Sequence, residues 1–191
     1  MITENADVVK GVFCGHWHNT AYTEFGVPSV ASLDSLKRII PENELFPIEK
    51  TPAWVAHHAF GAWGAERWLC MSTLEKYAQT PLDSLEKVVE MSQWLQTEGY
   101  KAVFEEARRQ APYCSMAINW CYNEPWKTAA GNNIIAYPSV PRPSYYYVQN
   151  AMRPALFSAR VAKFDWAEGE TFEIGKGKVL REGKDVAIIA N

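Results

Sequence analysis

One long amphipathic segment limits the folds open to this chain of 191 residues. From Pro81 to Gln110, apolar side chains recur at three- and four-residue steps, with one interruption at Gly99. This spacing predicts a helix that packs one face against a core. In the next segment, Tyr113 to Tyr122, both sets of alternate positions are mostly apolar, which is typical of a parallel strand covered on both sides. A long helix followed by such a strand favours an α/β fold.

Shorter elements are expected around this pair. Thr23–Phe25 is predicted to form a short strand, and Ser32 or Asp34 to cap a short helix that Pro41 stops. A further helix is expected near Ser144–Met152. Segments with strand character also occur at Asp7–Cys14, Ala155–Ala162, Thr171–Ile174 and Asp185–Ala190.

Composition excludes several classes of function. Nineteen Lys and Arg against 22 Asp and Glu leave no basic surplus, so nucleic acid is not an expected partner. No apolar run reaches the roughly 18 residues that span a bilayer, and the start of the chain lacks the pattern of a signal peptide. No membrane partner and a cytoplasmic location are therefore expected. The four cysteines form no CxxC pair, so neither a disulfide scaffold nor a structural metal site is expected. No cofactor is expected either, because Gly175, Gly177 and Gly183 lack the strand-then-helix context of a phosphate loop.

Four stretches of the chain resemble the catalytic domain of glycoside hydrolase family 2, which includes β-galactosidases, β-glucuronidases and β-mannosidases. They follow one another in the family's order: TEFGVPSV at Thr23–Val30, the segment Leu82–Gln110, SMAINWCYNEPW at Ser115–Trp126, and RPSYYYVQNAMRPALFSARV at Arg142–Val161. The resemblance implies an α/β chain that forms the C-terminal part of a TIM (β/α) barrel, incomplete, followed by a few β-strands. It also implies a carbohydrate substrate.

The resemblance assigns roles to individual residues. The family cleaves β-glycosides with retention, using two carboxylates. Its nucleophile lies in a Glu-Phe-Gly turn at the end of the seventh barrel strand, which Glu24 matches. Trp120 matches the aromatic floor beneath the sugar on the eighth strand. Asn123 and Glu124, at the carboxyl end of that strand, are expected to reach the same substrate pocket.

The turn Asn123-Glu124-Pro125 is typical of the acid/base residue in several related barrel glycosidases. The chain order argues against that role, because the family's acid/base precedes the nucleophile, whereas Glu124 follows Glu24. No Asn-Glu pair in that order occurs before Glu24, so the family's acid/base is absent. Hydrolysis by this chain in isolation is therefore expected to be weak or absent.

Both ends of the chain resemble other families. VVKGVFCGHWHN at Val8–Asn19 is similar to the closing motif of calcineurin-like metallophosphoesterases, where the histidines corresponding to His16 and His18 bind a dinuclear metal centre. The other ligand motifs of those enzymes have no room before His16. The segment Glu173–Asn191 resembles the start of the C-terminal domain of transketolase-type enzymes such as deoxyxylulose-phosphate synthase, without a cofactor motif.

These resemblances divide the chain into a phosphoesterase-like segment 1–21, a partial glycosidase barrel 22–153 and strands with a transketolase-like tail 154–191, which suggests a recombined or generated chain. Three functions stay open: a glycosidase fragment, a metal-dependent phosphoesterase using His16 and His18, and a non-catalytic carbohydrate-binding or structural module.

An incomplete sheet leaves strand edges open, and three tryptophans are expected to be exposed beside them: Trp54, Trp63 and Trp68. Self-association is therefore expected.

Overall fold

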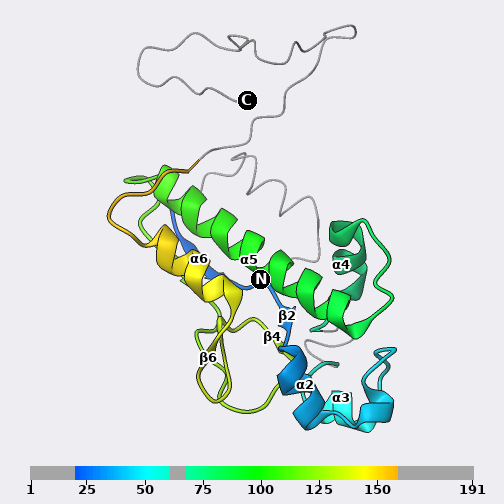
Figure 1. The fold of residues 1–191 in the computed structure, drawn as a ribbon. Coiled ribbons are helices and arrows are strands. Elements are labelled where there is room, and N and C mark those ends of the chain that lie inside the picture. The colour runs from blue at the N-terminus through cyan, green and yellow to red at the C-terminus, as the bar shows by residue number, and fades with distance from the viewer. Residues whose placement is uncertain (1–19, 61–67, 159–191) are drawn as a thin grey trace, which may run out of the picture. The chain divides into compact units, whose positions relative to one another are not determined.

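The computed structural model describes residues 20–60 and 68–158 (Figure 1). The chain divides into two compact units, Met1–Val161 and Ala162–Asn191, and every described residue belongs to the first. His16, His18, Trp63, the strand expected at Asp7–Cys14 and the transketolase-like tail lie outside the described residues.

The described part is a mixed α/β arrangement of short strands around one long helix. In chain order its elements are β1 (Tyr22–Phe25), β2 (Ser29–Val30), α2 (Leu33–Ile39), the 3-10 helix η1 (Glu42–Glu44), α3 (Pro52–Ala56), α4 (Met71–Ala78), α5 (Leu85–Arg109), β3 (Ala117–Asn119), β4 (Ala130–Gly131), β5 (Ile135–Ala136), β6 (Val140–Pro141) and α6 (Pro143–Ala151).

The strands form three separate pairs. The parallel pair β1–β3 joins the two strands that carry the glycosidase-like motifs, as the α/β expectation requires. The pairs β2–β4 and β5–β6 are antiparallel. Each sheet has two strands within the described residues, so the C-terminal barrel portion predicted from the sequence is not shown there; only the mixed α/β character is confirmed.

Two strand predictions are wrong: one strand is shorter than predicted, and the other is absent from the described residues. The strand expected over Tyr113–Tyr122 is confined to β3, because Cys114 N–H still donates to Gln110 O at 3.0 Å and keeps the preceding residues in the turn after α5. Ile118 is 52% exposed, so this strand is not covered on both sides. The described part of Ala155–Ala162, residues 155–158, is not a strand.

The predicted long helix is confirmed as α5. It starts later than Pro81, at Leu85, because the Ser84 side chain accepts from the N–H of Lys87 and caps the first turn. Helix α6 packs along α5, and α4 packs against it as well (Figure 1). The expected helices at the Ser32 cap and near Ser144–Met152 are confirmed as α2 and α6.

A buried polar stripe on α5 was not predicted. Ser92, Gln96 and Tyr100 follow one another at four-residue steps and are 2%, 0% and 0% exposed. Ser92 Oγ accepts from Val30 N–H at 3.0 Å, and Gln96 Nε2 donates to Val27 O at 3.0 Å. The stripe therefore satisfies backbone groups of the segment between β1 and α2, most of which lies outside any strand.

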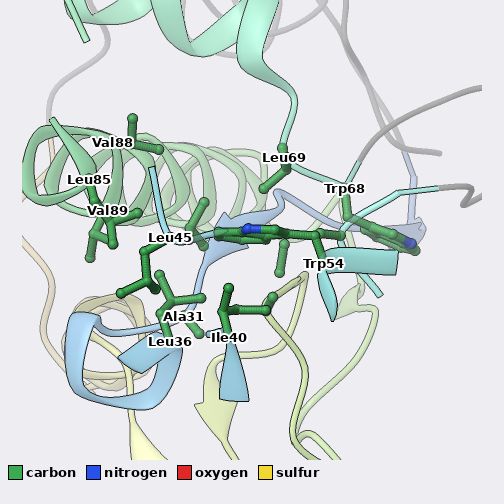
Figure 2. Packing of buried hydrophobic residues seen from close by; sticks show 14 of the residues in the cluster. Ala31, Leu36, Ile40, Leu45, Trp54, Trp68, Leu69, Leu85, Val88 and Val89 are labelled. Carbon is green, nitrogen blue, oxygen red and sulfur yellow. The ribbon is translucent and has the colours of Figure 1, made fainter. Parts of the chain in front are cut away.

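The larger core cluster gathers around Trp54, which is fully buried between residues of α2, α5 and the loops beside them (Figure 2). Its indole Nε1–H donates to Glu44 O at 2.7 Å, which satisfies the one polar group of the side chain. Trp68 is 8% exposed. The prediction that Trp54 and Trp68 are exposed is therefore wrong, and these rings do not supply a surface for self-association.

No helix of the described part is long and apolar enough to cross a bilayer.

The interruption at Gly99 has a packing cause. A Cβ placed on Gly99 would lie 2.6 Å from Val27 Cγ2, closer than any tolerable contact, and the β-branched valine has little rotamer freedom with which to move away. We expect Gly99→Ala to lower the free energy of unfolding by about 1 to 2 kcal/mol, although alanine favours a helix. In a Val27→Ala background the same substitution should be neutral or stabilising. Denaturant unfolding of the four proteins measures this, and an equal loss in both backgrounds would contradict the packing explanation.

Candidate functional site

Glu24 and Trp120 come together at the carboxyl ends of β1 and β3. Tyr22 pairs with Ala117, and Phe25 pairs with Asn119. One residue further, Trp120 N–H donates to Phe25 O at 2.7 Å. Parallel strands present their carboxyl ends at the same edge, so the backbones that carry Glu24 and Trp120 are neighbours, as the family resemblance implied.

A register shift separates the two paired positions on β1, which uses one more residue than β3 between them. Such a bulge changes the direction of the side chains that it carries. Both residues within it, Thr23 and Glu24, are exposed. The Glu24 carboxylate is therefore open to solvent, while Trp120 beside it is half-buried.

Gly26 permits a close approach of three chain segments next to Glu24. A Cβ on Gly26 would lie 2.6 Å from Asn132 Nδ2 and 2.8 Å from the backbone oxygen of Trp120. No side chain fits in that space, so the turn that follows Glu24 requires glycine here. Asn132 is 4% exposed and forms part of the wall behind the turn.

Hydrogen bonds hold this wall in place. The Tyr100 hydroxyl donates to Asn132 O at 2.5 Å. Burial raises the pKa of Tyr100 well above its ordinary value, so the phenol stays protonated and remains a donor. Asn119 Nδ2 donates to Cys121 O at 3.0 Å, which fixes the turn after β3, and the peptide bond between Trp120 and Cys121 is cis.

The charge of Glu24 acts on the thiol of Cys121. Burial raises the pKa of the Cys121 thiol, and the negative charge of Glu24 raises it further. The thiol is therefore uncharged near neutral pH and adds no second negative charge beside the carboxylate.

Glu124 does not lie in the open part of the site. It is 4% exposed, and its Oε1 accepts from Nη2 of Arg142, which is itself 3% exposed. Its Oε2 accepts from Tyr137 N–H at 3.2 Å. Both carboxylate oxygens are therefore engaged within the protein.

Arg142 links Glu124 to the segment after β1. Its Nη1 donates to Ser29 O at 3.1 Å and also to Ser29 Oγ. Burial lowers the pKa of the guanidinium, and the charge of Glu124 opposes that shift. Sequence reasoning missed this residue, although an arginine between two prolines at the start of a helix was a visible signal for a buried role.

Asn123, the remaining predicted substrate-binding residue, is exposed, and its backbone forms an isolated parallel bridge with Ile135. The structure thus places Glu24, Trp120 and Cys121 together at one strand edge and turns Glu124 inward. No group of three or more His, Cys, Asp or Glu side chains within the described residues could hold a metal ion.

A separate hollow of about 370 Å³ lies between α2 and the loop after β3. Its wall includes Arg38, Lys127 and Tyr137, and Glu124 borders it, but Glu24 and Trp120 do not. Because the hollow lacks both residues, we centre the candidate site on the strand edge instead.

The rings of His57 and His58 contact tryptophan side chains. His57 Nδ1 lies 2.7 Å from Lys127 O. The ring of His57 stacks with that of Trp126, and the ring of His58 is tilted against it. His58 also contacts Trp68, with ring centroids 5.0 Å apart. Burial lowers the pKa of His58, and the charge of Glu124 partly offsets this.

Comparison with known protein families and with curated proteins finds no match. Among solved structures, the chain is similar to the β-D-mannosidase of Dictyoglomus thermophilum, with a TM-score of 0.61 and 19% identity over 79% of this chain and 18% of the mannosidase. It is also similar to the exo-β-D-glucosaminidase CsxA, with a TM-score of 0.55 and 20% identity over 72% of this chain and 18% of that enzyme.

The chain shares the fold of a segment of each of these two enzymes. This likeness extends over most of the chain but less than a fifth of either enzyme. At such identity it establishes the fold and not the activity. The comparisons give no support to the phosphoesterase and transketolase resemblances.

The buried ion pair between Glu124 and Arg142 predicts that Glu124 stabilises the fold, which an unfolding experiment can test. Glu124→Gln leaves the Arg142 guanidinium buried without its counter-charge, which should lower the free energy of unfolding by about 3 to 5 kcal/mol. Asp83→Asn, which breaks the exposed pair between Asp83 and Lys87, is the matched control and should leave the unfolding midpoint nearly unchanged. Equal, small effects of the two substitutions in denaturant unfolding would show that the buried pair does not stabilise the fold.

The lowered pKa of His58 predicts a pH effect on stability. The unfolded chain takes up a proton at His58 at higher pH than the folded chain, so this contribution is present above about pH 6.5 and is lost as the pH falls through the folded pKa. His58→Asn removes the titrating group, and asparagine tolerates the positive φ of 66° found here. Between pH 7 and 5 the melting midpoint of the original chain should therefore fall further than that of the variant. Parallel pH curves would contradict this.

Proposed function

We propose that this chain carries the nucleophile side of a retaining β-glycosidase site of the family 2 type. Glu24 is the nucleophile, and Trp120 forms the floor beneath the sugar. The observation that supports this most directly is the meeting of Glu24 and Trp120 at the carboxyl ends of adjacent parallel strands, which is where barrel enzymes carry their active sites.

The surroundings of Glu24 suit a nucleophile. Its carboxylate is exposed on a bulge, and Gly26 lets the backbone after it pack closely against Asn132 and the Trp120 carbonyl. In the proposed step one Glu24 oxygen forms a bond to the anomeric carbon while the bond to the leaving oxygen breaks. The leaving oxygen takes the electron pair, and water later releases the sugar from Glu24.

Protonation of the leaving oxygen limits this chemistry. Glu124 is unsuited to donate that proton, because its two oxygens are occupied by Arg142 and Tyr137 in a buried position. Within the proposal it is a positioning residue that holds the loop after β3. The chain alone is therefore expected to react with substrates whose leaving groups need no proton.

The structural neighbours suggest the sugar class. One is a β-D-mannosidase and the other an exo-β-D-glucosaminidase. We therefore propose a β-linked hexopyranoside, with mannose-configured compounds as the first probes. A glucosyl probe represents the glucosamine configuration, because fluorine replaces the 2-amino group in a 2-deoxy-2-fluoro sugar. The phosphoesterase alternative depends on His16 and His18, and no observation on the described residues favours it.

An activated 2-deoxy-2-fluoro β-mannoside tests the assignment of Glu24. The fluorine slows release of the covalent sugar, and the good leaving group replaces the missing acid, so the intact protein should gain the mass of one sugar on Glu24. Peptide mass spectrometry locates the adduct.

Two variants make this labelling specific. Glu24→Gln keeps the shape of the side chain without a nucleophile and should abolish the adduct. Glu49→Gln removes another exposed carboxylate and should label like the original chain. Absence of labelling with mannosyl, glucosyl, galactosyl and glucuronyl probes would overturn the proposal, as would an adduct that persists in Glu24→Gln. Binding of sugars without labelling would favour the non-catalytic carbohydrate-binding module.

A further inference from the structure

Trp126 is a large aromatic side chain held on a fixed loop and left 43% exposed. The loop is fixed from two sides. Lys127 O lies 2.7 Å from His57 Nδ1, and Ala129 N–H donates to His57 O at 2.6 Å. Ala129 O in turn accepts from Ala31 N–H at 2.8 Å, which connects the loop to the start of α2. The backbone that carries Trp126 is therefore held in place before any ligand arrives.

Two imidazoles support the ring of Trp126. The His57 ring lies nearly parallel to it, at 25° and a centroid distance of 6.2 Å, and the His58 ring lies at 40° and 6.3 Å. His58 is backed by the buried Trp68. This layered arrangement fixes the tilt of the indole and leaves a large part of its surface to solvent.

The loop that carries Trp126 also carries exposed polar residues. Lys127 and Asn123 are exposed within three residues of it, and no ion pair among the described residues engages the Lys127 ammonium. An exposed apolar ring on a loop that also carries exposed donors and acceptors can match the two kinds of surface on a pyranose, one carrying C–H groups and one carrying hydroxyls. A purely apolar partner would leave these polar groups without solvent or a hydrogen bond.

Trp126 also lies within reach of the candidate site. It follows Cys121, which senses the charge of Glu24, by five residues, so their Cα atoms are at most about 18 Å apart. A short oligosaccharide spans such a distance.

We propose that Trp126, supported by His57 and His58, is a second sugar platform that binds a more distant unit of an oligosaccharide whose reacting unit lies at Glu24. This inference rests on the proposed function for the placement of the reacting sugar. The platform accounts for an exposed tryptophan on a loop that hydrogen bonds hold rigid. It also predicts that the chain distinguishes oligosaccharides from monosaccharides.

The test is a binding measurement on the full chain with a β-1,4-linked mannose trisaccharide and a β-1,4-linked glucosamine trisaccharide, compared with the two monosaccharides. Trp126→Ala should weaken binding of at least one trisaccharide roughly tenfold, the effect of losing one aromatic contact, and leave monosaccharide binding unchanged. Trp94→Ala is the matched control, because Trp94 is 42% exposed on α5 and also contacts another aromatic ring, that of Tyr147. It should bind like the original chain.

A third variant separates loss of the platform from loss of the fold. Trp126→Phe keeps a ring against the imidazoles and should give an intermediate affinity with an unchanged melting midpoint. The inference is overturned if neither trisaccharide binds the original chain, if Trp126→Ala binds both as tightly as the original chain, or if Trp94→Ala weakens binding equally. Loss of trisaccharide affinity in Trp126→Ala without any labelling of Glu24 would support the platform and reject the glycosidase. Labelling of Glu24, together with unchanged trisaccharide affinity in Trp126→Ala, would support the glycosidase and reject the platform.

Discussion

The hydrogen bonds that α5 gives to irregular backbone hold the candidate site together. Strands β1 and β2 are short, and Val27 and Pro28 between them lie outside any strand. Gln96 satisfies the Val27 carbonyl by donating to it, and the other end of its amide accepts from Ser144 Oγ of α6 at 2.8 Å. A helix that supplies both apolar and polar contacts can position backbone that a sheet would otherwise have to hold.

Arg142 extends the same principle to the other side of the site. One guanidinium contacts the carbonyl of Ser29 and the carboxylate of Glu124, so the segment after β1 and the loop after β3 share a single cation. Arginine suits this position because its planar group donates in several directions at once. The negative charge of Glu124 is consequently neutralised inside the protein, and Glu24 remains the exposed carboxylate at the strand edge.

The sequence was informative where a residue pattern has one structural cause. The spacing of apolar residues predicted α5, Ser32 predicted the start of α2, and the motifs around Glu24 and Trp120 predicted that their strands would be neighbours. It was uninformative where the cause lies far away in the chain. Strands of two residues, such as β2 and β4, are too short for a period to be visible, and α4 follows a residue in the left-handed region without a side-chain cap. Trp54 was misjudged because the residues that bury it come from several elements.

The hydrogen bonds between Arg142 and Ser29 also limit when this part of the chain can finish folding. The two residues are separated by 113 positions, and the entropy lost on closing a loop grows with its length. During synthesis from the N-terminus, β1 and the segment after it emerge long before α6 exists. Until Arg142 arrives, Glu124 has no counter-charge and the Ser29 carbonyl lacks its donor. The hydrogen bonds between Arg142 and Ser29 therefore form only after α6 has been synthesised, and contacts so distant in sequence form slowly.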